Sequence, residues 1–281
     1  MKKIAVITGS TGGIGSLVAE RLAEDDWNLI LINRSQSKSQ KQVEHFSNKY
    51  PNQVFKPYYA DFLDLSSVKQ AAAQIADEHK CIHALYNISG YITNKLTYSA
   101  QDVESQLAVN ALAPYVLVKA LTANLAEGAK ETSSYIVNFS TSMISSIKKL
   151  DMDNLVRPKN TGGMGKIYAR AKLLVNIFNQ SLKDDLANQG VSILAVCPGP
   201  TKTKMTENME GAPWIFKILM PLLFKDADKQ TNKLVTGINE ALATNQTGLF
   251  ISEGKVKREP SVVYDKQVQG QVISLLDELS T

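Results

Sequence analysis

The chain has 281 residues, of which 44% are hydrophobic and 21% charged, so it has enough apolar material for a large core and is not a disordered protein. Its 31 basic and 27 acidic residues leave a net charge of +4, which is too balanced to indicate a nucleic-acid-binding protein. Two cysteines, Cys81 and Cys197, exclude a disulfide framework and a multi-cysteine zinc site, and they fit a reducing compartment. The three histidines, His45, His79 and His83, have no metal-ligand pattern around them in the sequence, so we expect no metal site.

Seven short apolar runs recur along the chain, each of the length of a buried parallel strand. Segments with apolar residues at helical spacing lie between several of them, over 18–22, 68–76, 107–120 and 173–182. This alternation predicts an α/β protein with a Rossmann-like, doubly wound, seven-stranded parallel sheet and helices on both faces. No linker rich in Pro, Gly or Ser interrupts the pattern, so we expect one domain over residues 1–281, with 143–165 as an insertion. The predicted strands are 4–7, 29–32, 54–59, 82–86, 135–139, 191–197 and 248–251.

The most apolar stretch of the sequence, residues 214–224, does not have the pattern of a membrane span. Lys217 and Pro221 interrupt it, and it is well short of the ~20 residues that a transmembrane helix requires. The first apolar run stops at Ile7 and is too short for the hydrophobic region of a signal peptide. We therefore expect no transmembrane segment and a cytoplasmic protein.

A glycine-rich loop follows the first predicted strand and opens the first predicted helix, with the sequence Thr8-Gly-Ser-Thr-Gly-Gly-Ile-Gly15. Glycines 9, 13 and 15 allow a tight turn and a close approach of the backbone to a pyrophosphate. The helix that begins there offers free N–H groups and the positive end of its dipole. Because glycine also makes ordinary turns, it is the position between a strand and a helix that favours a dinucleotide site.

The end of the second predicted strand bears on the choice between NAD and NADP. An acidic residue there would bind the ribose 2′-hydroxyl of NAD. This chain has Asn33, Arg34 and Ser35 instead, with Lys38 close by, and an arginine can hold a 2′-phosphate. We therefore predict NADP(H) as the cofactor; the alternative is that Arg34 is an ordinary surface arginine.

A tyrosine and a lysine share one face of the helix predicted near residue 170. Tyr168 and Lys172 are separated by four residues, which places both side chains on the same side of a helix. A free tyrosine has a pKa of ~10, too high for efficient proton transfer at neutral pH. A nearby ammonium group favours the phenolate, so we expect Lys172 to lower the pKa of Tyr168. Such a tyrosine can protonate a carbonyl oxygen as a hydride reaches the adjacent carbon.

Together with the glycine loop, these motifs resemble the short-chain dehydrogenase/reductase family over almost the whole chain. Asp61-Phe62 is placed like the adenine contact of that family, and Asn87-Ile-Ser-Gly90 resembles its Asn-Asn-Ala-Gly element. Asn110, Tyr168 and Lys172 match its catalytic asparagine, tyrosine and lysine. Pro198-Gly-Pro-Thr-Lys-Thr203 resembles the element whose last threonine holds the nicotinamide. The implied cofactor-binding residues are Gly9, Ser10, Thr11, Gly13, Ile14, Gly15, Asn33, Arg34, Ser35, Asp61, Phe62, Asn87, Ile88, Ser89, Gly90, Tyr168, Lys172, Pro198, Gly199, Thr201 and Thr203.

The catalytic serine of the family has no identical counterpart at the end of the fifth predicted strand. Alignment of the strand puts Thr141 in its place, and a threonine hydroxyl can donate and accept as a serine hydroxyl does. A shift of one residue offers Ser142 instead, and Ser140 is the third candidate. We expect Thr141 to orient the substrate carbonyl, with Ser142 as the alternative. The resemblance also implies that Lys172 holds the nicotinamide ribose and that Asn110 retains a water linking Lys172 to solvent.

The insertion at 143–165 and the order of motifs in the C-terminal part are most similar to the family branch with retinol dehydrogenases, protochlorophyllide reductases and monomeric carbonyl reductases. Residues 204–226 lie where the family has its substrate lid, and the apolar run within them predicts a lipophilic aldehyde, ketone or alcohol as substrate. Three other interpretations fit this run: a core helix, a dimer contact, and a patch in peripheral contact with a membrane. We expect either a homodimer or a monomer.

Two functions of other classes remain as alternatives. A non-catalytic NADPH-binding regulator would not need Asn110, Tyr168 and Lys172 together. A scaffold that binds a partner through residues 214–224 would not need the glycine loop. The sequence therefore favours an NADP(H)-dependent oxidoreductase for small-molecule carbonyl and alcohol substrates.

Overall fold

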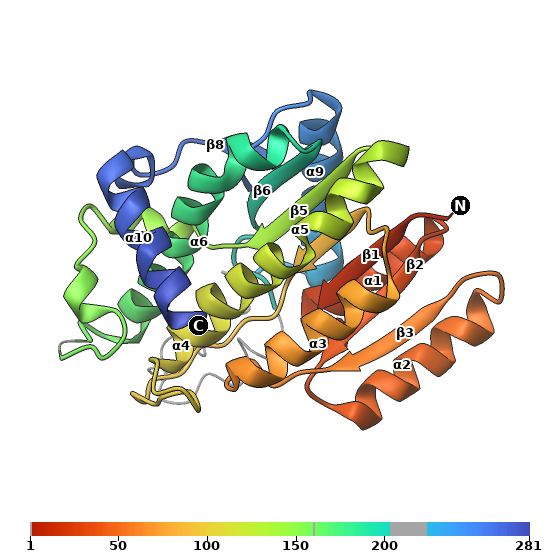
Figure 1. The fold of residues 1–281 in the computed structure, drawn as a ribbon, viewed down its shortest axis with the longest axis horizontal. Coiled ribbons are helices and arrows are strands. Elements are labelled where there is room, and N and C mark those ends of the chain that lie inside the picture. Colours follow the sequence, from red (N-terminus) through yellow and green to blue (C-terminus); the bar gives the residue numbers. More distant parts are fainter. Residues whose placement is uncertain (1, 160, 203–223) are drawn as a thin grey trace.

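A sheet of parallel strands forms the centre of the computed structural model, which describes residues 2–159, 161–202 and 224–281 (Figure 1). Within these residues the sheet has eight strands in the order β3-β2-β1-β4-β5-β6-β7-β8. The first seven are parallel neighbours, so the predicted α/β sheet is confirmed. The strands are β1 Ile4–Thr8, β2 Asn28–Asn33, β3 Phe55–Tyr59, β4 Ala84–Asn87, β5 Ser134–Phe139, β6 Val191–Cys197, β7 Leu249–Ser252 and β8 Lys255–Lys257.

The prediction of seven strands is wrong at one edge, where β8 adds an eighth strand antiparallel to β7. Glu253 and Gly254, with φ of 52° and 79°, make the two-residue turn that reverses the chain. All three residues of β8 are exposed, so the segment has no buried alternate positions by which the sequence could have indicated a strand. Lysines at both ends of this edge strand also disfavour pairing with another chain.

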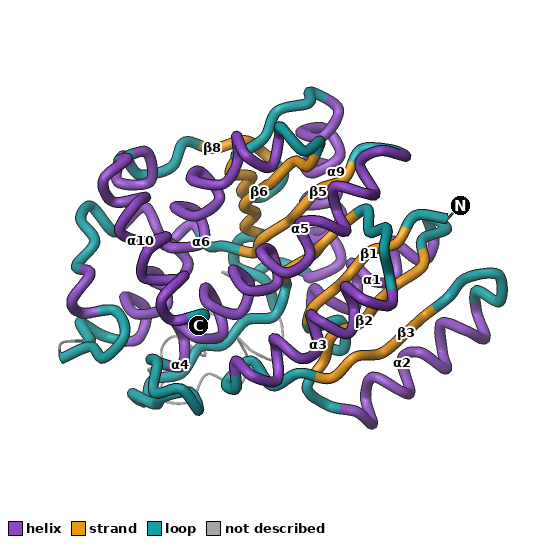
Figure 2. The backbone as a smooth tube through the Cα atoms, viewed as in Figure 1, coloured by secondary structure: helices purple, strands orange, loops and turns teal. Residues whose placement is uncertain are grey.

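Helices cover both faces of the sheet, which explains why its strands are almost continuously apolar (Figure 2). One buried apolar cluster joins the sheet to α3, α5, α6 and α10, and another joins the opposite face to α1, α2 and α9. Neighbours along β1 alternate accordingly: Val6 belongs to the first cluster, and Ala5 and Ile7 to the second. The bounds are α1 Gly13–Glu24, α2 Gln36–Lys49, α3 Leu65–Glu78, α5 Ala113–Glu131, α6 Met164–Ala187, α9 Ala227–Ala243 and α10 Lys266–Leu279.

The helix that crosses the middle of the sheet has a wider turn in it. α4, Ser105–Leu107, continues into a π-helical segment, Ala108–Leu112, and then into α5. Residues 105–131 together are long and apolar enough to span a membrane by length and composition, but 78% of the most apolar window is buried inside the protein. The packing of this helix against the sheet, α3 and α6 accounts for its apolar character.

The segment 143–165, which we predicted as an insertion, packs onto the first of these clusters through Ile144, Ile147, Leu150 and Leu155. The predicted lid, 204–226, lies outside the described residues as far as residue 223. The chain on its two sides is close together, since the N–H of Lys202 donates to the carbonyl of Lys225 over 3.0 Å.

The strand order places a topological switch point between β1 and β4. From β1 the chain continues outwards to β2 and β3, and it then returns to β4 on the other side of β1. In open α/β sheets the loops after the strands on either side of such a point diverge and leave a crevice at the carboxyl ends.

Candidate active site

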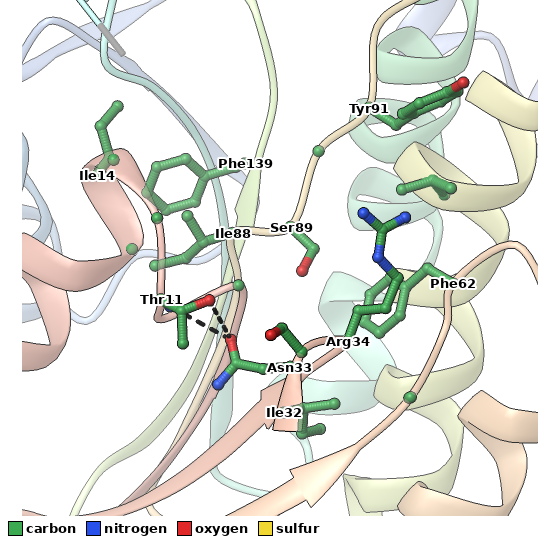
Figure 3. A pocket seen from close by; sticks show the side chains of 18 of the residues that line it. Thr11, Ile14, Ile32, Asn33, Arg34, Phe62, Ile88, Ser89, Tyr91 and Phe139 are labelled. Atoms are coloured by element: carbon green, nitrogen blue, oxygen red, sulfur yellow. Dashed lines mark hydrogen bonds between the residues drawn. The ribbon is translucent and has the colours of Figure 1, made fainter. Parts of the chain in front are cut away.

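A cavity of about 460 Å³ occupies the crevice at the carboxyl ends of the strands (Figure 3). Its walls come from the loops after β1, β2, β3, β4, β5 and β6 and from the first part of α6. Residues far apart in the chain therefore meet here, among them Gly9, Arg34, Ser89 and Tyr168.

The glycine loop lies against the loop that follows β4. Gly9 has a φ of +69°, and a Cβ there would lie 2.9 Å from the Ser89 hydroxyl oxygen. A Cβ on Gly15 would overlap the carbonyl oxygen of Gly9. The hydroxyl oxygen of Thr8 accepts the N–H groups of Ile88 and Ser89, over 2.9 and 3.0 Å, and so holds the two loops together. Glycine is therefore required in this loop for close backbone packing, and the start of α1 lines the cavity together with the loop.

Asn33, which we predicted as a cofactor contact, is buried and fixes the glycine loop. Its side-chain oxygen accepts the backbone N–H and the hydroxyl of Thr11, over 3.3 and 3.4 Å (Figure 3). Its amide group donates to the hydroxyls of Ser10 and Ser39, over 2.8 and 3.1 Å. Ser10 in turn donates to Gln42 over 2.8 Å, so it points into α2 and does not line the cavity. These side chains pre-order the loop, a role that the motif alone did not indicate.

Positive charge gathers at the adjacent rim of the cavity. Arg34 and Lys38 both line it, both are exposed, and within the described part of the chain neither forms an ion pair. In Figure 3 the Arg34 side chain extends from the end of β2 along the cavity. Asp61 lines the same end and uses one carboxylate oxygen to accept the N–H of Leu63 over 3.0 Å. Two exposed cations beside a glycine loop can accommodate an anionic group larger than a hydroxyl.

At the other end of the cavity, Tyr168 and Lys172 lie one turn apart on α6. Lys172 is only 2% exposed, and its Nζ donates to the carbonyl of Phe139 over 2.7 Å. Burial lowers the pKa of Lys172 to about 7, with a smaller opposite effect from Cys197. Burial also raises the pKa of the Tyr168 hydroxyl, and Cys197 adds to that shift.

The lowering of the pKa of Tyr168 that we expected from Lys172 stays a prediction, because burial acts on this pKa in the opposite direction. The Lys172 Nζ is 6.0 Å from the centre of the Tyr168 ring, and loss of hydration dominates both groups. Sequence spacing identified the pair but gave no information on its burial.

Asn110 lies in the π-helical segment and is fully buried. Its side chain accepts the N–H of Tyr91 over 3.0 Å and donates to the carbonyls of Tyr91 and Gln106, over 2.7 and 2.8 Å. Four positions after Asn110 stands Pro114, which has no backbone N–H. The backbone carbonyl of Asn110 therefore lacks the donor that an α-helix would normally provide. This missing donor favours the wider turn, a feature frequent at functional sites. Asn110 thus places Tyr91, which lines the cavity.

Three hydroxyl side chains follow β5, and each is in a different environment. Ser140 lines the cavity, but its hydroxyl donates to Asn176 over 2.5 Å. The Thr141 oxygen accepts the N–H of Met143 over 3.3 Å, which leaves its own hydrogen available. Ser142 is exposed, and its backbone N–H donates to the Cys197 sulfur over 3.2 Å.

The structure thus brings most of the predicted residues to one cavity. The lining includes Gly9, Thr11, Gly13, Ile14, Gly15, Asn33, Arg34, Ser35, Asp61, Phe62, Ile88, Ser89, Gly90, Tyr168, Lys172 and Pro198. Seven predicted residues do not belong to the lining: Ser10, Asn87, Asn110, Thr141, Ser142, Gly199 and Thr201. Thr203 lies outside the described residues. Lining residues that we did not assign to the site are Gly12, Ile32, Lys38, Ala60, Leu63, Tyr91, Val109, Phe139 and Ser140.

A group of potential metal ligands lies elsewhere, which corrects the expectation that the histidines have no such neighbours. The His83 Nε2 is 3.7 Å from the Cys81 sulfur and 3.5 Å from a carboxylate oxygen of Glu131. However, the His83 Nδ1 accepts the backbone N–H of Ile4 over 3.1 Å. Neutral His83 must therefore carry its hydrogen on Nε2, and this nitrogen has no lone pair for a metal. The arrangement suits a hydrogen bond to Glu131 or Cys81.

The parallel sheet, the glycine-lined cavity at its switch point and the Tyr–Lys pair on α6 define the class of dinucleotide-dependent oxidoreductases. The family model for short chain dehydrogenases matches residues 3–213. The chain therefore belongs to the short-chain dehydrogenase/reductase family, as the sequence motifs predicted.

Individual relatives support the same assignment. Human polyprenol dehydrogenase is 25% identical over 284 residues, which cover 99% of this chain and 85% of that protein. Human retinol dehydrogenase 11 is 27% identical over 214 residues, which cover 76% of this chain and 66% of that protein. The NADPH-bound carbonyl reductase from chicken fatty liver has the same fold, with a TM-score of 0.68 and 20% identity over 91% of this chain and 98% of its own. The chain is accordingly an oxidoreductase of the retinol dehydrogenase-like branch, a group of enzymes for carbonyl and alcohol groups.

Proposed function

We propose that the protein uses NADP(H) to interconvert a lipophilic aldehyde or ketone and its alcohol, with Tyr168 as the general acid and base. The observation that carries this proposal is the distribution of groups in one cavity. Two exposed cations, Arg34 and Lys38, line the end next to β2, and the half-buried Tyr168 lines the end next to β5 together with the buried Lys172.

The cavity fits an extended dinucleotide. The glycine loop leaves room for a pyrophosphate at the start of α1, since no side chain projects from Gly9, Gly13 or Gly15. Arg34 and Lys38 would hold a 2′-phosphate, and Asp61 and Phe62 would contact the adenine. When bound, the cofactor supplies or accepts the hydride.

The protein's own residues manage the proton. In the reductive direction Tyr168 donates its hydroxyl hydrogen to the carbonyl oxygen of the substrate, and in the oxidative direction it takes the hydrogen back from the alcohol. Lys172 is nearly excluded from water and has a pKa of about 7, so near neutral pH it can exist in either protonation state. A charged Lys172 would favour the Tyr168 phenolate.

A hydroxyl after β5 would orient the substrate carbonyl. Ser140 already donates its hydrogen to Asn176, so it cannot donate to a carbonyl as well. Thr141 uses its oxygen only as an acceptor, so we propose Thr141 for this role and keep Ser142 as the alternative.

Two observations support a lipophilic substrate. The relatives named above are, by their names, dehydrogenases of polyprenol and retinol, which are long apolar alcohols. In this chain Met143 is 43% exposed and lies next to Gly165 at the start of α6, one turn before Tyr168. An exposed methionine next to the catalytic helix offers an adaptable apolar contact.

The direct test is a fluorescence titration of the purified protein with NADPH and, separately, with NADH, followed by a panel of carbonyl compounds. We expect tighter binding of NADPH and oxidation of NADPH that depends on an apolar aldehyde or ketone. Equal affinity for both nucleotides would contradict the cofactor assignment. Binding without turnover of any panel member would contradict the catalytic one.

A further inference from the structure

A buried carboxylate outside the cavity is fully engaged in hydrogen bonds. Figure 1 shows the connection between β8 and α10. Glu259 lies in this connection and is 5% exposed. One carboxylate oxygen accepts from the Asn176 amide over 2.7 Å, and the other accepts from Gln180 and the Tyr264 hydroxyl over 3.0 and 3.1 Å. Burial raises the pKa of Glu259, and these three donors act in the opposite direction. These three donors offset the cost of burying the carboxylate and hold it in one orientation.

The position of Glu259 fixes the direction of the next hydrogen bonds. An ionised carboxylate only accepts, so Asn176 must present its NH₂ group to Glu259. The Asn176 oxygen then faces β5 and accepts the hydroxyl hydrogen of Ser140 over 2.5 Å. Since Ser140 also lines the cavity, its remaining lone pairs can act there only as acceptors.

This chain of hydrogen bonds ends at the residues of the proposed reaction. Asn176 follows Lys172 by one turn of α6, and Ser140 lies between Phe139 and Thr141. The Phe139 carbonyl accepts from Lys172, so β5 and α6 are joined at two successive levels. Any shift of Asn176 would therefore displace the end of β5 relative to Tyr168 and Lys172.

We propose that Glu259 is a positioning residue of the active site, which acts through Asn176 and Ser140 to hold the end of β5 against the catalytic face of α6. This inference rests on the proposed function. It assigns a catalytic consequence to the C-terminal part of the chain, beyond the residues 3–213 that match the family model.

The first variant is Glu259→Gln, which keeps the size of the side chain. One end of the new side chain is an NH₂ group, which must face either the donors of Gln180 and Tyr264 or the NH₂ group of Asn176, so Asn176 is no longer held in one orientation. We expect kcat to fall roughly 10- to 100-fold, the range that a small misplacement of a catalytic group can cause. The Kd for NADPH should stay within about twofold, because no group of this network binds the nucleotide phosphates. An unchanged kcat would overturn the proposal.

The decisive variant exchanges the two groups, Glu259→Gln with Asn176→Asp. The amide introduced at position 259 can then donate to the carboxylate introduced at position 176 and accept from Gln180 and Tyr264, while that carboxylate still accepts the Ser140 hydrogen. We expect this double variant to recover most of the lost kcat, whereas Asn176→Asp alone places two carboxylates together and lowers kcat. A double variant as poor as the worse single variant would overturn the assigned hydrogen-bond direction.

Tyr264→Phe serves as the matched control, since it removes one donor of Glu259 and leaves Asn176 in place. Its kcat should stay within about threefold of wild type, and a loss as large as that of Glu259→Gln would overturn the proposal in favour of general destabilisation. Hydrogen exchange of the amides of 139–142 in the protein without nucleotide gives a readout independent of turnover. Exchange there should accelerate in Glu259→Gln and return in the double variant; unchanged exchange would overturn the proposal. If wild type turns over no substrate, the proposed function fails and this exchange measurement decides the positioning role by itself.

Discussion

The two ends of the cavity differ in how their functional groups are supported. At the end next to β2, Arg34 and Lys38 are exposed on the rim, and the glycine loop beneath them is held by hydrogen bonds from Thr8 and Asn33. At the end next to β5, Lys172 is 2% exposed and its pKa is shifted to about 7. The first end depends on preformed backbone and free charge, whereas the second depends on groups kept away from water.

This difference separates binding from chemistry. Exposed cations lose little hydration before a ligand arrives, so they add affinity without a large cost to the folded protein. Buried Lys172 costs folding free energy while it is charged, and the fold tolerates that cost at the place where a proton must move. Substitutions at the end next to β2 should therefore change mainly the Kd for the nucleotide, whereas substitutions at the end next to β5 should change mainly kcat.

Tyr168→Phe tests the catalytic end and should have the largest effect. Removal of a general acid that is positioned on the substrate typically lowers the rate by 10²- to 10⁴-fold, so we expect a loss of kcat in about that range. The Kd for NADPH should change by less than about threefold, because the hydroxyl is the only group lost. Steady-state kinetics and a fluorescence titration check the two values. A variant with more than a tenth of the wild-type kcat would show that another group transfers the proton.

Arg34→Glu tests the nucleotide end. A charged hydrogen bond contributes about 1.5–3 kcal/mol, so the Kd for NADPH should rise roughly 10- to 100-fold while the Kd for NADH changes little or falls. Lys41→Glu, on the exposed side of α2 and outside the cavity, is the matched control for the same change of charge. An unchanged ratio of the two affinities would identify Arg34 as an ordinary surface arginine.

The fold was predictable because strands that are buried on both faces of a parallel sheet consist of nearly continuous apolar residues. The runs at Ile4–Thr8 and Val191–Cys197, among others, are apolar on both faces and were assigned at nearly their true bounds. β8 has no such apolar run, because its three residues are exposed and its pairing depends on the turn at Glu253 and Gly254. α2 was also missed, since only Ser39 and Phe46 are buried in its 14 residues.

The site was predictable where a motif places backbone or charge, as in the glycine loop and at Arg34. It was not predictable where a neighbour from a distant part of the chain decides the role of a side chain. Asn33, which the sequence predicts as a cofactor contact, lines the cavity and also holds Thr11 by a hydrogen bond that the sequence does not indicate. Ser140 was the least favoured of the three hydroxyls in the sequence, but it is the one that lines the cavity. Its hydroxyl donates to the side-chain oxygen of Asn176, which lies 36 residues later in the chain.

The buried lysine predicts an unusual pH dependence of stability. In the folded protein Lys172 has a pKa of about 7, below its usual unfolded value of about 10.4, so between these values the unfolded chain binds more protons. The free energy of unfolding without nucleotide should therefore include a component that rises by about 2 kcal/mol from pH 7 to pH 9. Lys172→Met should lack this component and be more stable than wild type at pH 7, although it should be inactive. Urea unfolding of both proteins at pH 7, 8 and 9 measures it, and parallel profiles would contradict the shifted pKa.

The smallest predicted effect distinguishes the two hydroxyls that follow Ser140. A neutral hydrogen bond contributes about 1 kcal/mol, so Thr141→Ala should lower kcat/KM for the carbonyl about fivefold, while Ser142→Ala should stay within about twofold. Thr141→Ser should retain the activity, because it keeps the hydroxyl and the hydrogen bond from Met143. The reverse order, with loss in Ser142→Ala only, would mean that the end of β5 turns by one residue when substrate binds. In that case the contact of the Ser142 N–H with Cys197 would have to break, which Cys197→Ala should make easier.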